Sequence, residues 1–225
     1  QAAVEVLEAA GFQVIVPSQP LCCGRPLYDF GLLPRATRLL KQTIAALRPI
    51  IAAGVPVVGL EPSCVAVFRD EMTNLLPDDQ DARRLSQQTY LLTEFLETKT
   101  DFAHLPKLQR RAIVHDHCHK KAVIKKDDEW KLLKQLGLDF EVLDSGCCGM
   151  AGSFGFVKEH YELSLKIGEL VLLPAVREAP EDTLIIADGF SCREQIAQTT
   201  KRRALHSAEV IQMAINSATN DLKDQ

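Results

Sequence analysis

Hydrophobic residues follow two patterns along this chain. They are nearly continuous in short runs, and in longer segments they recur every three or four positions between polar residues. Short runs are typical of buried strands, and the longer pattern is typical of amphipathic helices. Because the two alternate, we predict right-handed βαβ units with parallel sheets. The predicted strands lie within 54–60, 111–115, 140–143 and 184–187, and the predicted helices at 34–53, 68–76, 87–97, 157–177, 192–200 and 207–217.

This order of elements occurs twice. Residues 3–24 and 130–149 both contain a helix that ends at a glycine, a short apolar strand and the sequence Cys-Cys-Gly. In each copy a helix and a strand follow, and the strand closes on a further cysteine, Cys64 or Cys192. We therefore predict an α/β fold of two pseudo-repeated βαβ subdomains, each a small parallel sheet flanked by helices. The first repeat is expected at residues 1–105 and the second at 106–225.

The chain opens at Gln1 in the middle of an amphipathic helix pattern, so we expect it to be a piece of a longer polypeptide. The strand of the first repeat that corresponds to 111–115 in the second would then precede Gln1.

In the second repeat, cysteines follow three predicted strands. Loops at the carboxyl ends of parallel strands lie together at one edge of a sheet. We therefore expect four thiols to converge there, those of Cys118, Cys147, Cys148 and Cys192. The first repeat shows only three corresponding thiols, those of Cys22, Cys23 and Cys64.

The arrangement of the seven cysteines points to metal or redox chemistry rather than to a disulfide framework. Neighbouring Cα atoms lie about 3.8 Å apart, less than the roughly 4.4 Å of a relaxed disulfide, so each Cys-Cys pair is a poor internal bridge. Four thiolates suit an iron-sulfur cluster or a structural zinc. Adjacent sulfurs favour two irons of one cluster, while zinc and metal-free buried thiols remain alternatives. Glycines beside the cysteines allow backbone amides to approach the sulfurs: Gly24, Gly149 and Gly152.

Histidines and arginines lie close to the cysteines. In an extended loop, three histidines would share the side opposite Cys118, where they could bond loop backbone, donate to cluster sulfur or replace a missing thiolate: His115, His117 and His119. Arg25 and Arg193 each follow shortly after a cysteine and could stabilise a reduced cluster by their charge. Surface salt bridges, to Asp29 and Glu194 respectively, are the alternative.

Composition excludes several classes of function. The chain is 46% hydrophobic and 25% charged with a net charge of −4, which gives no electrostatic reason to expect nucleic acid. No apolar run approaches the roughly 20 residues of a membrane-spanning helix, and no signal segment opens the chain. Nucleotide-binding glycine motifs, a P-loop and a nucleophile elbow are also missing, so we expect no catalytic residue for substrate chemistry in this chain.

The motifs EPSC, HDHCHKKA, GCCGMAGSFGF and DGFSCREQI resemble the cysteine-rich CCG domain family, and the resemblance covers nearly the whole chain. This family includes the cysteine-rich subunit of heterodisulfide reductase and the iron-sulfur subunit of glycolate oxidase. Similar motifs end large fused FAD-linked D-lactate and D-2-hydroxyglutarate dehydrogenases. The resemblance implies an iron-sulfur electron-transfer module of a 2-hydroxyacid dehydrogenase, with FAD on another domain or subunit. A quinone or another carrier would accept the electrons, and we expect a cytoplasmic protein or one peripheral at the inner face of the cell membrane.

The chain departs from the family motif, which ends in CxxC. Glu61 and Gly189 stand where the first cysteine of that pair would be. With four thiolates in the second repeat, the resemblance implies an ordinary 4Fe-4S cluster rather than the five-thiolate form of heterodisulfide reductase. The first repeat, with three thiolates and Glu61, would hold a labile cluster or none. Two alternative functions are open. One is a structural or docking module with zinc or metal-free cysteines, and the other is thiol-disulfide catalysis.

Overall fold

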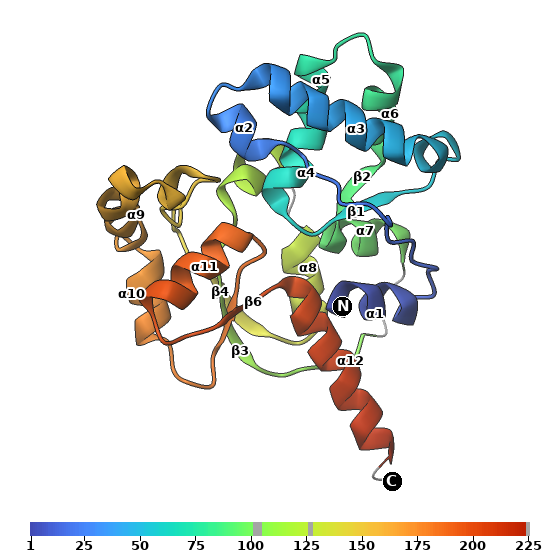
Figure 1. Cartoon of the computed structure of the whole chain (residues 1–225). Coiled ribbons are helices and arrows are strands. Elements are labelled where there is room, and N and C mark those ends of the chain that lie inside the picture. The colour runs from blue at the N-terminus through green and yellow to red at the C-terminus, as the bar shows by residue number, and fades with distance from the viewer. Residues whose placement is uncertain (101–104, 126–127, 224–225) are drawn as a thin grey trace.

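Parallel strands form two small sheets in the computed structural model, which describes residues 1–100, 105–125 and 128–223 (Figure 1). We call 1–100 the N-terminal half and 105–223 the C-terminal half. In the N-terminal half, β1 (Val57–Gly59) pairs with β2 (Thr89–Leu91). The C-terminal sheet has the order β4-β3-β5-β6. Its strands are β3 (Arg111–Val114), β4 (Asp139–Val142), β5 (Leu184–Ile186) and β6 (Ala204–Leu205). All these pairings are parallel, which confirms the predicted α/β fold.

Helices surround both sheets. Those of the N-terminal half are α1 (Ala2–Ala9), α2 (Arg25–Asp29), α3 (Leu33–Ala52), α4 (Pro62–Arg69), α5 (Glu71–Leu75), α6 (Gln80–Gln88) and α7 (Leu92–Lys99). The C-terminal half has the π-helix η2 (Lys120–Ile124), the 3₁₀ helices η3 (Phe154–Phe156) and η4 (Lys158–His160), and the α-helices α8 (Asp128–Gln135), α9 (Tyr161–Gly168), α10 (Leu172–Glu178), α11 (Phe190–Thr199) and α12 (Ser207–Lys223). Among the described residues, no helix combines the length and the apolar character needed to cross a bilayer.

Three predicted helices differ from those observed. The helix predicted at 87–97 is interrupted: residues 87–88 end α6, residues 89–91 form strand β2 by pairing with β1, and α7 begins at Leu92. The helix predicted at 157–177 is divided into η4, α9 and α10, and the helix at 68–76 breaks at Asp70. Strand pairing and breaks in helical hydrogen bonding are tertiary effects that local periodicity does not report.

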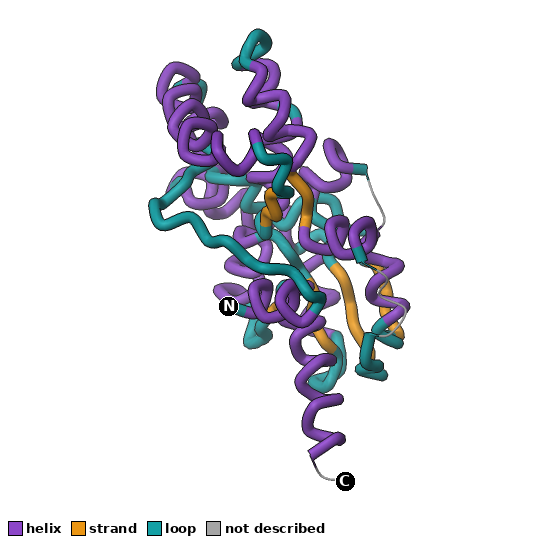
Figure 2. Tube along the Cα trace, turned by 90° about the vertical axis from the view of Figure 1, so that its right-hand side faces the viewer, coloured by secondary structure: helices purple, strands orange, loops and turns teal. Residues whose placement is uncertain are grey.

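The short strand predicted after α1 is also absent from the described structure. Residues 12–17 form part of the long loop between α1 and α2, which runs along one side of the molecule in Figure 2. The side chains of Ile15 and Val16 are 62% and 69% exposed. An extended segment needs a neighbouring strand to satisfy its backbone groups, and no described strand pairs with this one.

Both faces of the C-terminal sheet are covered, as is usual for parallel sheets. Leu184 and Ile186 of β5 pack into a core with α1, α8 and α12. Ile185, which alternates with them, faces the opposite core of α10 and α11. Two site residues, Cys148 and Cys192, belong to this second core. The fold therefore buries one side of the thiol site among hydrophobic residues.

A buried ion pair anchors the segment that follows β3. Lys120 lies at the start of η2, and its Nζ is 2.6 Å from Glu129 Oε2 of α8 and 3.0 Å from Asp116 Oδ1. The same ammonium lies 4.4 Å from the centroid of the Trp130 ring. Burial by itself lowers the pKa of Lys120, but the attraction of Glu129 and Asp116 raises it above its ordinary value. Because Cys118 is two residues earlier, this contact also holds the thiol segment in place.

We expect Glu129→Ala to lower the free energy of unfolding by ~3 kcal/mol, because it removes one partner of a buried charge. Urea denaturation measures this change. Lys131→Ala is the matched control, since the Lys131 side chain is 59% exposed and its ion pairs are at the surface. That control should change stability by less than about 1 kcal/mol. Equal effects of the two substitutions would contradict the anchoring role.

Candidate metal centre

Four thiols of the C-terminal half converge at the carboxyl ends of its strands. Cys118 follows β3, Cys147 and Cys148 follow β4, and Cys192 lies in the first turn of α11 after β5. Since β3 pairs with both β4 and β5, these three strand ends are neighbours. The structure therefore brings together the four cysteines predicted to meet there. We call this set, Cys118, Cys147, Cys148 and Cys192, the thiol quartet.

Hydrogen bonds connect the thiol quartet in series, from Cys118 to Cys147, then to Cys148 and on to Cys192. The bonds from Cys118 and Cys148 lower the pKa of Cys147, and the amide of Gly149 adds a hydrogen bond of 3.3 Å to its sulfur. A hydrogen bond with Cys148 lowers the pKa of Cys192 in the same way. The neighbouring His115 lowers it further, by a smaller amount. The pKa values of Cys118 and Cys148 are raised by the same contacts. The geometry thus favours thiolates at Cys147 and Cys192.

Burial is uneven across the thiol quartet. Cys148 and Cys192 are 2% and 1% exposed, whereas Cys118 and Cys147 are partly exposed. Met150 is buried on the same side as Cys148. The edge of the site at Cys148 and Cys192 is therefore excluded from water, and the edge at Cys118 and Cys147 lies near the surface.

Two glycines permit the loop after Cys148. Gly149 has a φ of +99°, and a Cβ there would lie 2.0 Å from the carbonyl oxygen of Ser164. Gly152 has a φ of +65°, and a Cβ there would lie 2.5 Å from Asp29 Oδ2 of α2. Both positions need glycine because of backbone conformation and close approach. Gly149 therefore supports the thiols directly, whereas Gly152 packs against the N-terminal half.

The three cysteines of the N-terminal half repeat part of this arrangement. Cys23 Sγ lies 2.9 Å from Cys64 Sγ, and the amide of Gly24 donates to Cys22 Sγ at 3.4 Å. The hydrogen bond from Cys64 lowers the pKa of Cys23 to about 7, and the same contact raises the pKa of Cys64. Cys22 itself is exposed. The Gly24 and Gly149 amides therefore make equivalent contacts in the two halves.

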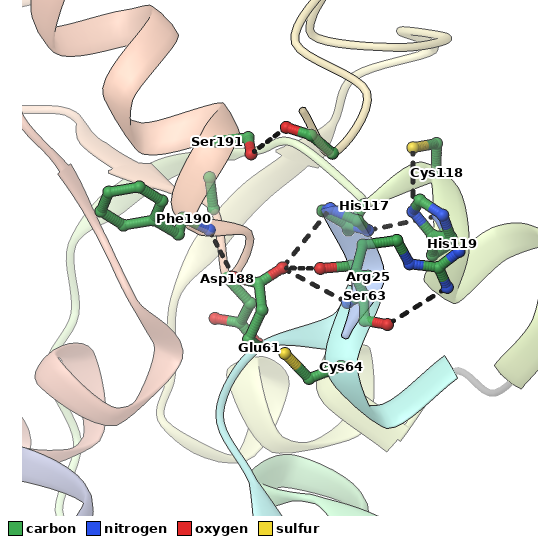
Figure 3. A network of polar contacts seen from close by, with 12 residues as sticks. Arg25, Glu61, Ser63, Cys64, His117, Cys118, His119, Asp188, Phe190 and Ser191 are labelled. Carbon is green, nitrogen blue, oxygen red and sulfur yellow. Dashed lines mark hydrogen bonds and ion pairs between the residues drawn. The ribbon is translucent and has the colours of Figure 1, made fainter. Parts of the chain in front are cut away.

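Glu61 connects the two halves at the centre of the polar network in Figure 3. Its Oε1 accepts from Ser63, at 3.3 Å from N and 2.7 Å from Oγ, and so caps the start of α4. The other oxygen accepts from the amide of Phe190 at 2.6 Å, at the start of α11. Its carboxylate is thus occupied by two helix N-termini, which is a role that the sequence did not reveal.

The three histidines do not share one side of the loop as predicted. His115 lies with Cys148 and Cys192, while His117 and His119 lie with Cys118. The extended loop ends at His117, because residues 118–124 turn into a helix, and alternation of sides stops there. His119 Nδ1 is 3.7 Å from Cys118 Sγ, and its ring stacks on His117 with centroids 5.4 Å apart. Burial, and secondarily the charge of Arg25, lower the pKa of His119.

His117 occupies the space next to Gly189. A Cβ at Gly189 would lie 2.2 Å from His117 Cδ2 and 3.1 Å from Cys192 Sγ. The His117 ring therefore occupies the space that the Cβ of a cysteine at position 189 would need. His117 Nδ1 accepts from the amide of His119 at 3.2 Å, and Nε2 is 3.9 Å from Glu61 Oε1.

Both arginines make internal contacts. Arg25 is buried, with Nη1 2.6 Å from Glu71 Oε1 and 3.5 Å from Asp29 Oδ1, and Nη2 donates to the Ser63 carbonyl at 3.3 Å. Arg193 Nη1 donates to the carbonyls of Ala187 and Asp188 at 2.9 and 2.5 Å. Arg193 therefore holds the chain that leads from β5 into α11, and the alternative of a salt bridge to Glu194 does not describe its contacts. Sequence reasoning missed Glu71 because nothing local links it to Arg25.

Comparison with known proteins gives consistent relatives. The family model described as "Cysteine-rich domain" (CCG) matches residues 1–69 and 112–197. A subunit of the anaerobic glycerol-3-phosphate dehydrogenase of Escherichia coli strain K12 is 31% identical over 94% of this chain and 54% of its own length. Lactate utilization protein A of Bacillus velezensis is 32% identical over 94% of this chain and 91% of its own length. The D-2-hydroxyglutarate dehydrogenase of Pantoea ananatis is 26% identical over 92% of this chain and 20% of its own length.

The chain thus spans about half of the length of the glycerol-3-phosphate dehydrogenase subunit and a fifth of the hydroxyglutarate enzyme. The two matched ranges contain all seven cysteines, so both halves contribute to the family match. On this match, and on the two relatives above 30% identity, the chain belongs to the cysteine-rich CCG domain family.

Proposed function

We propose that this chain is an iron-sulfur electron-transfer module of a flavin-linked dehydrogenase. The observation that carries the proposal is the thiol quartet, in which four cysteines from three strand ends contact one another at the edge of one sheet. Thiolates are the protein ligands that iron-sulfur clusters use. The four residues proposed to hold the cluster are Cys118, Cys147, Cys148 and Cys192.

The residues around the thiol quartet suit a cluster. A bound cluster takes up and releases single electrons, and its potential depends on burial and on hydrogen bonds to its sulfurs. Gly149 donates its amide to Cys147, while Met150 and the hydrophobic core around Cys148 exclude water from one side. The partly exposed edge at Cys118 and Cys147 is where an electron donor or acceptor could approach.

The ligand count supports a 4Fe-4S cluster. Gly189 supplies no thiol, and the His117 ring fills the adjoining space. Four thiolates are therefore available in the C-terminal half rather than five. In the N-terminal half, three thiols are present and Glu61 is engaged by Ser63 and Phe190, which supports a labile cluster or none there.

The names of the relatives support the wider role. Two of these names are those of a dehydrogenase or of a dehydrogenase subunit, and the third is that of a lactate utilization protein. We propose that a 2-hydroxyacid is oxidised at FAD on another domain or subunit, and that electrons then pass through this chain to a quinone or another carrier. We also propose a cytoplasmic location with peripheral association at the membrane.

Two repeats, 1–105 and 106–225, remain our proposed domain division. The equivalent amide-to-sulfur contacts of Gly24 and Gly149 support it. In both halves, a cysteine-bearing helix also directly follows a strand that pairs in parallel with the next strand: α4 follows β1, with α5 and α6 before β2, and α11 follows β5 before β6. The boundary is next to residues 101–104, which lie outside the described part of the chain.

One observation favours a second candidate function. Cys23 and Cys64 are 2.9 Å apart, and the pKa of Cys23 is lowered to about 7 by that contact. A thiol with this pKa is about half thiolate at pH 7, and the thiolate is the reactive form in thiol-disulfide exchange. Metal-free protein that turns over a disulfide substrate would favour this function.

We expect anaerobically purified protein to contain about four iron and four sulfide per chain and to absorb broadly near 400 nm, with bleaching by dithionite. Cys148→Ser should remove most of this iron, because it deletes the thiol at the middle of the buried contacts. Cys64→Ser is the matched control in the other half and should retain the cluster of the thiol quartet. Zinc at one ion per chain without colour, or full iron in Cys148→Ser, would contradict the proposal.

Gly189→Cys tests whether a fifth thiolate can be added. We expect this substitution to reduce iron content and to destabilise the fold by ~1–3 kcal/mol, because its Cβ would overlap the His117 ring. The double substitution Gly189→Cys with His117→Ala should recover stability, measured by urea denaturation. His117→Ala alone is the control. If Gly189→Cys is tolerated without loss, the His117 ring does not define that space.

A further inference from the structure

We propose that His115 is an additional iron ligand, binding through Nε2 beside Cys148 and Cys192 at the buried end of the thiol quartet. This inference rests on the proposed iron-sulfur function and extends it, because the cluster would then have mixed cysteine and histidine ligation. One iron would carry both a thiolate and an imidazole. The argument comes from the position of His115, the contacts of its two ring nitrogens and the different surroundings of the other two histidines.

The backbone holds His115 in a fixed place. Its amide donates to the carbonyl of Ile186 at 2.9 Å, which extends the pairing of β3 with β5 by one residue. The residue is 2% exposed. One ring nitrogen lies within 4.8 Å of the sulfurs of both Cys148 and Cys192, and those sulfurs lie within the same distance of each other. All three residues are buried, so the group is compact and excluded from water.

The two ring nitrogens of His115 differ in their partners. Nδ1 lies 2.7 Å from the hydroxyl of Ser145, which is itself 2% exposed. Nε2 is buried and has no partner at hydrogen-bond geometry among the described residues, so the effect of His115 on the pKa of Cys192 reflects proximity rather than a well-formed hydrogen bond. A buried polar atom without a partner is unfavourable and calls for a physical reason. Binding of a metal by Nε2 would supply that reason, since a ring nitrogen of His115 lies within 4.8 Å of two thiol sulfurs.

The contact with Ser145 prepares His115 for ligation. A metal-bound histidine usually donates its other ring N–H to an oxygen, which fixes the tautomer and the ring orientation. The Ser145 hydroxyl can accept from Nδ1–H, and this leaves the lone pair of Nε2 free. Lys121 in turn donates to the Ser145 carbonyl at 2.5 Å and helps to hold the residue.

His117 and His119 have other roles. His117 Nδ1 accepts a hydrogen bond from the amide of His119, so in the neutral ring the proton is on Nε2, which faces Glu61. That tautomer is a donor and not a ligand. His119 stacks on His117 at the partly exposed edge, beside Cys118. Of the three histidines, His115 is the one that groups with two buried thiols and has a buried ring nitrogen, Nε2, without a hydrogen-bond partner among the described residues.

A neutral imidazole at this position has a chemical consequence. The family motif has a further cysteine where this chain has Gly189, and His115 would supply a ligand without the negative charge of a thiolate. Replacement of cysteine by histidine ligands raises the reduction potential of iron-sulfur centres. His115 would thus make the cluster a better electron acceptor than an all-thiolate equivalent.

Pulsed electron paramagnetic resonance of the dithionite-reduced protein tests this assignment, with the histidines labelled by ¹⁵N. We expect the wild-type spectrum to show strong coupling to one histidine nitrogen and to change with the isotope. His115→Ala should lose this coupling and still bind iron through the four thiolates. His119→Ala and His117→Ala are matched controls from the same segment, and both should keep it.

The outcomes separate this inference from the function on which it rests. Wild-type protein that contains iron and sulfide but shows no histidine coupling would overturn the ligand assignment and leave the cluster proposal intact. Coupling that survives in His115→Ala, or disappears in His117→Ala, would also overturn it. Protein without iron and sulfide would overturn both. If His115→Ala does not fold, the labelled wild-type protein still decides the question, and Ser145→Ala should alter the coupling because the ring loses its support.

Discussion

The pairing of β3 with both β4 and β5 is the constraint on which the site depends. Val114 at the end of β3 is in register with Val142 of β4 and with Ile186 of β5. The three strands run in the same direction, so the residues that follow them emerge at one level of one edge. Backbone hydrogen bonds thus bring together sulfurs that are separated by up to 74 positions in the chain, from Cys118 to Cys192. A one-residue shift of register would turn the strand side chains to the other face and displace the segments that carry the thiols.

Contacts between the two halves surround this edge. Glu61 accepts from Phe190, His206 Nε2 lies 2.8 Å from the Leu60 carbonyl, and Gly152 packs against Asp29. Each contact joins a loop of one half to the end of a strand or to one end of a helix in the other half. Residues of the N-terminal half therefore pack next to the thiol quartet, although all four of its sulfurs come from the C-terminal half.

Charge is distributed unevenly around the site. The buried side has thiols and His115, whereas Arg25 and Lys120 are both held by carboxylates, Glu71 in one case and Glu129 with Asp116 in the other. Cations compensated in this way contribute less positive potential to the sulfurs than their proximity in sequence suggests. Hydrogen bonds from backbone amides, such as that of Gly149, are the closer electrostatic support for anionic sulfur.

The sequence by itself determined the α/β class and which four thiols meet, those of Cys118, Cys147, Cys148 and Cys192, while the doubled order of elements stays a prediction. It did so because periodicity, the Cys-Cys-Gly motifs and the geometry of parallel sheets are local or generic properties. Only the tertiary structure decided that residues 89–91 form a strand, that Glu61 caps two helices and that His115 is separated from His117 and His119. These features depend on partners far away in the chain: β1 for residues 89–91, Phe190 for Glu61, and Cys192 for His115. Glu61 and Phe190 are 129 positions apart, and no local pattern contains so distant a partner, which is the physical reason why the contacts of Glu61 had to come from the fold.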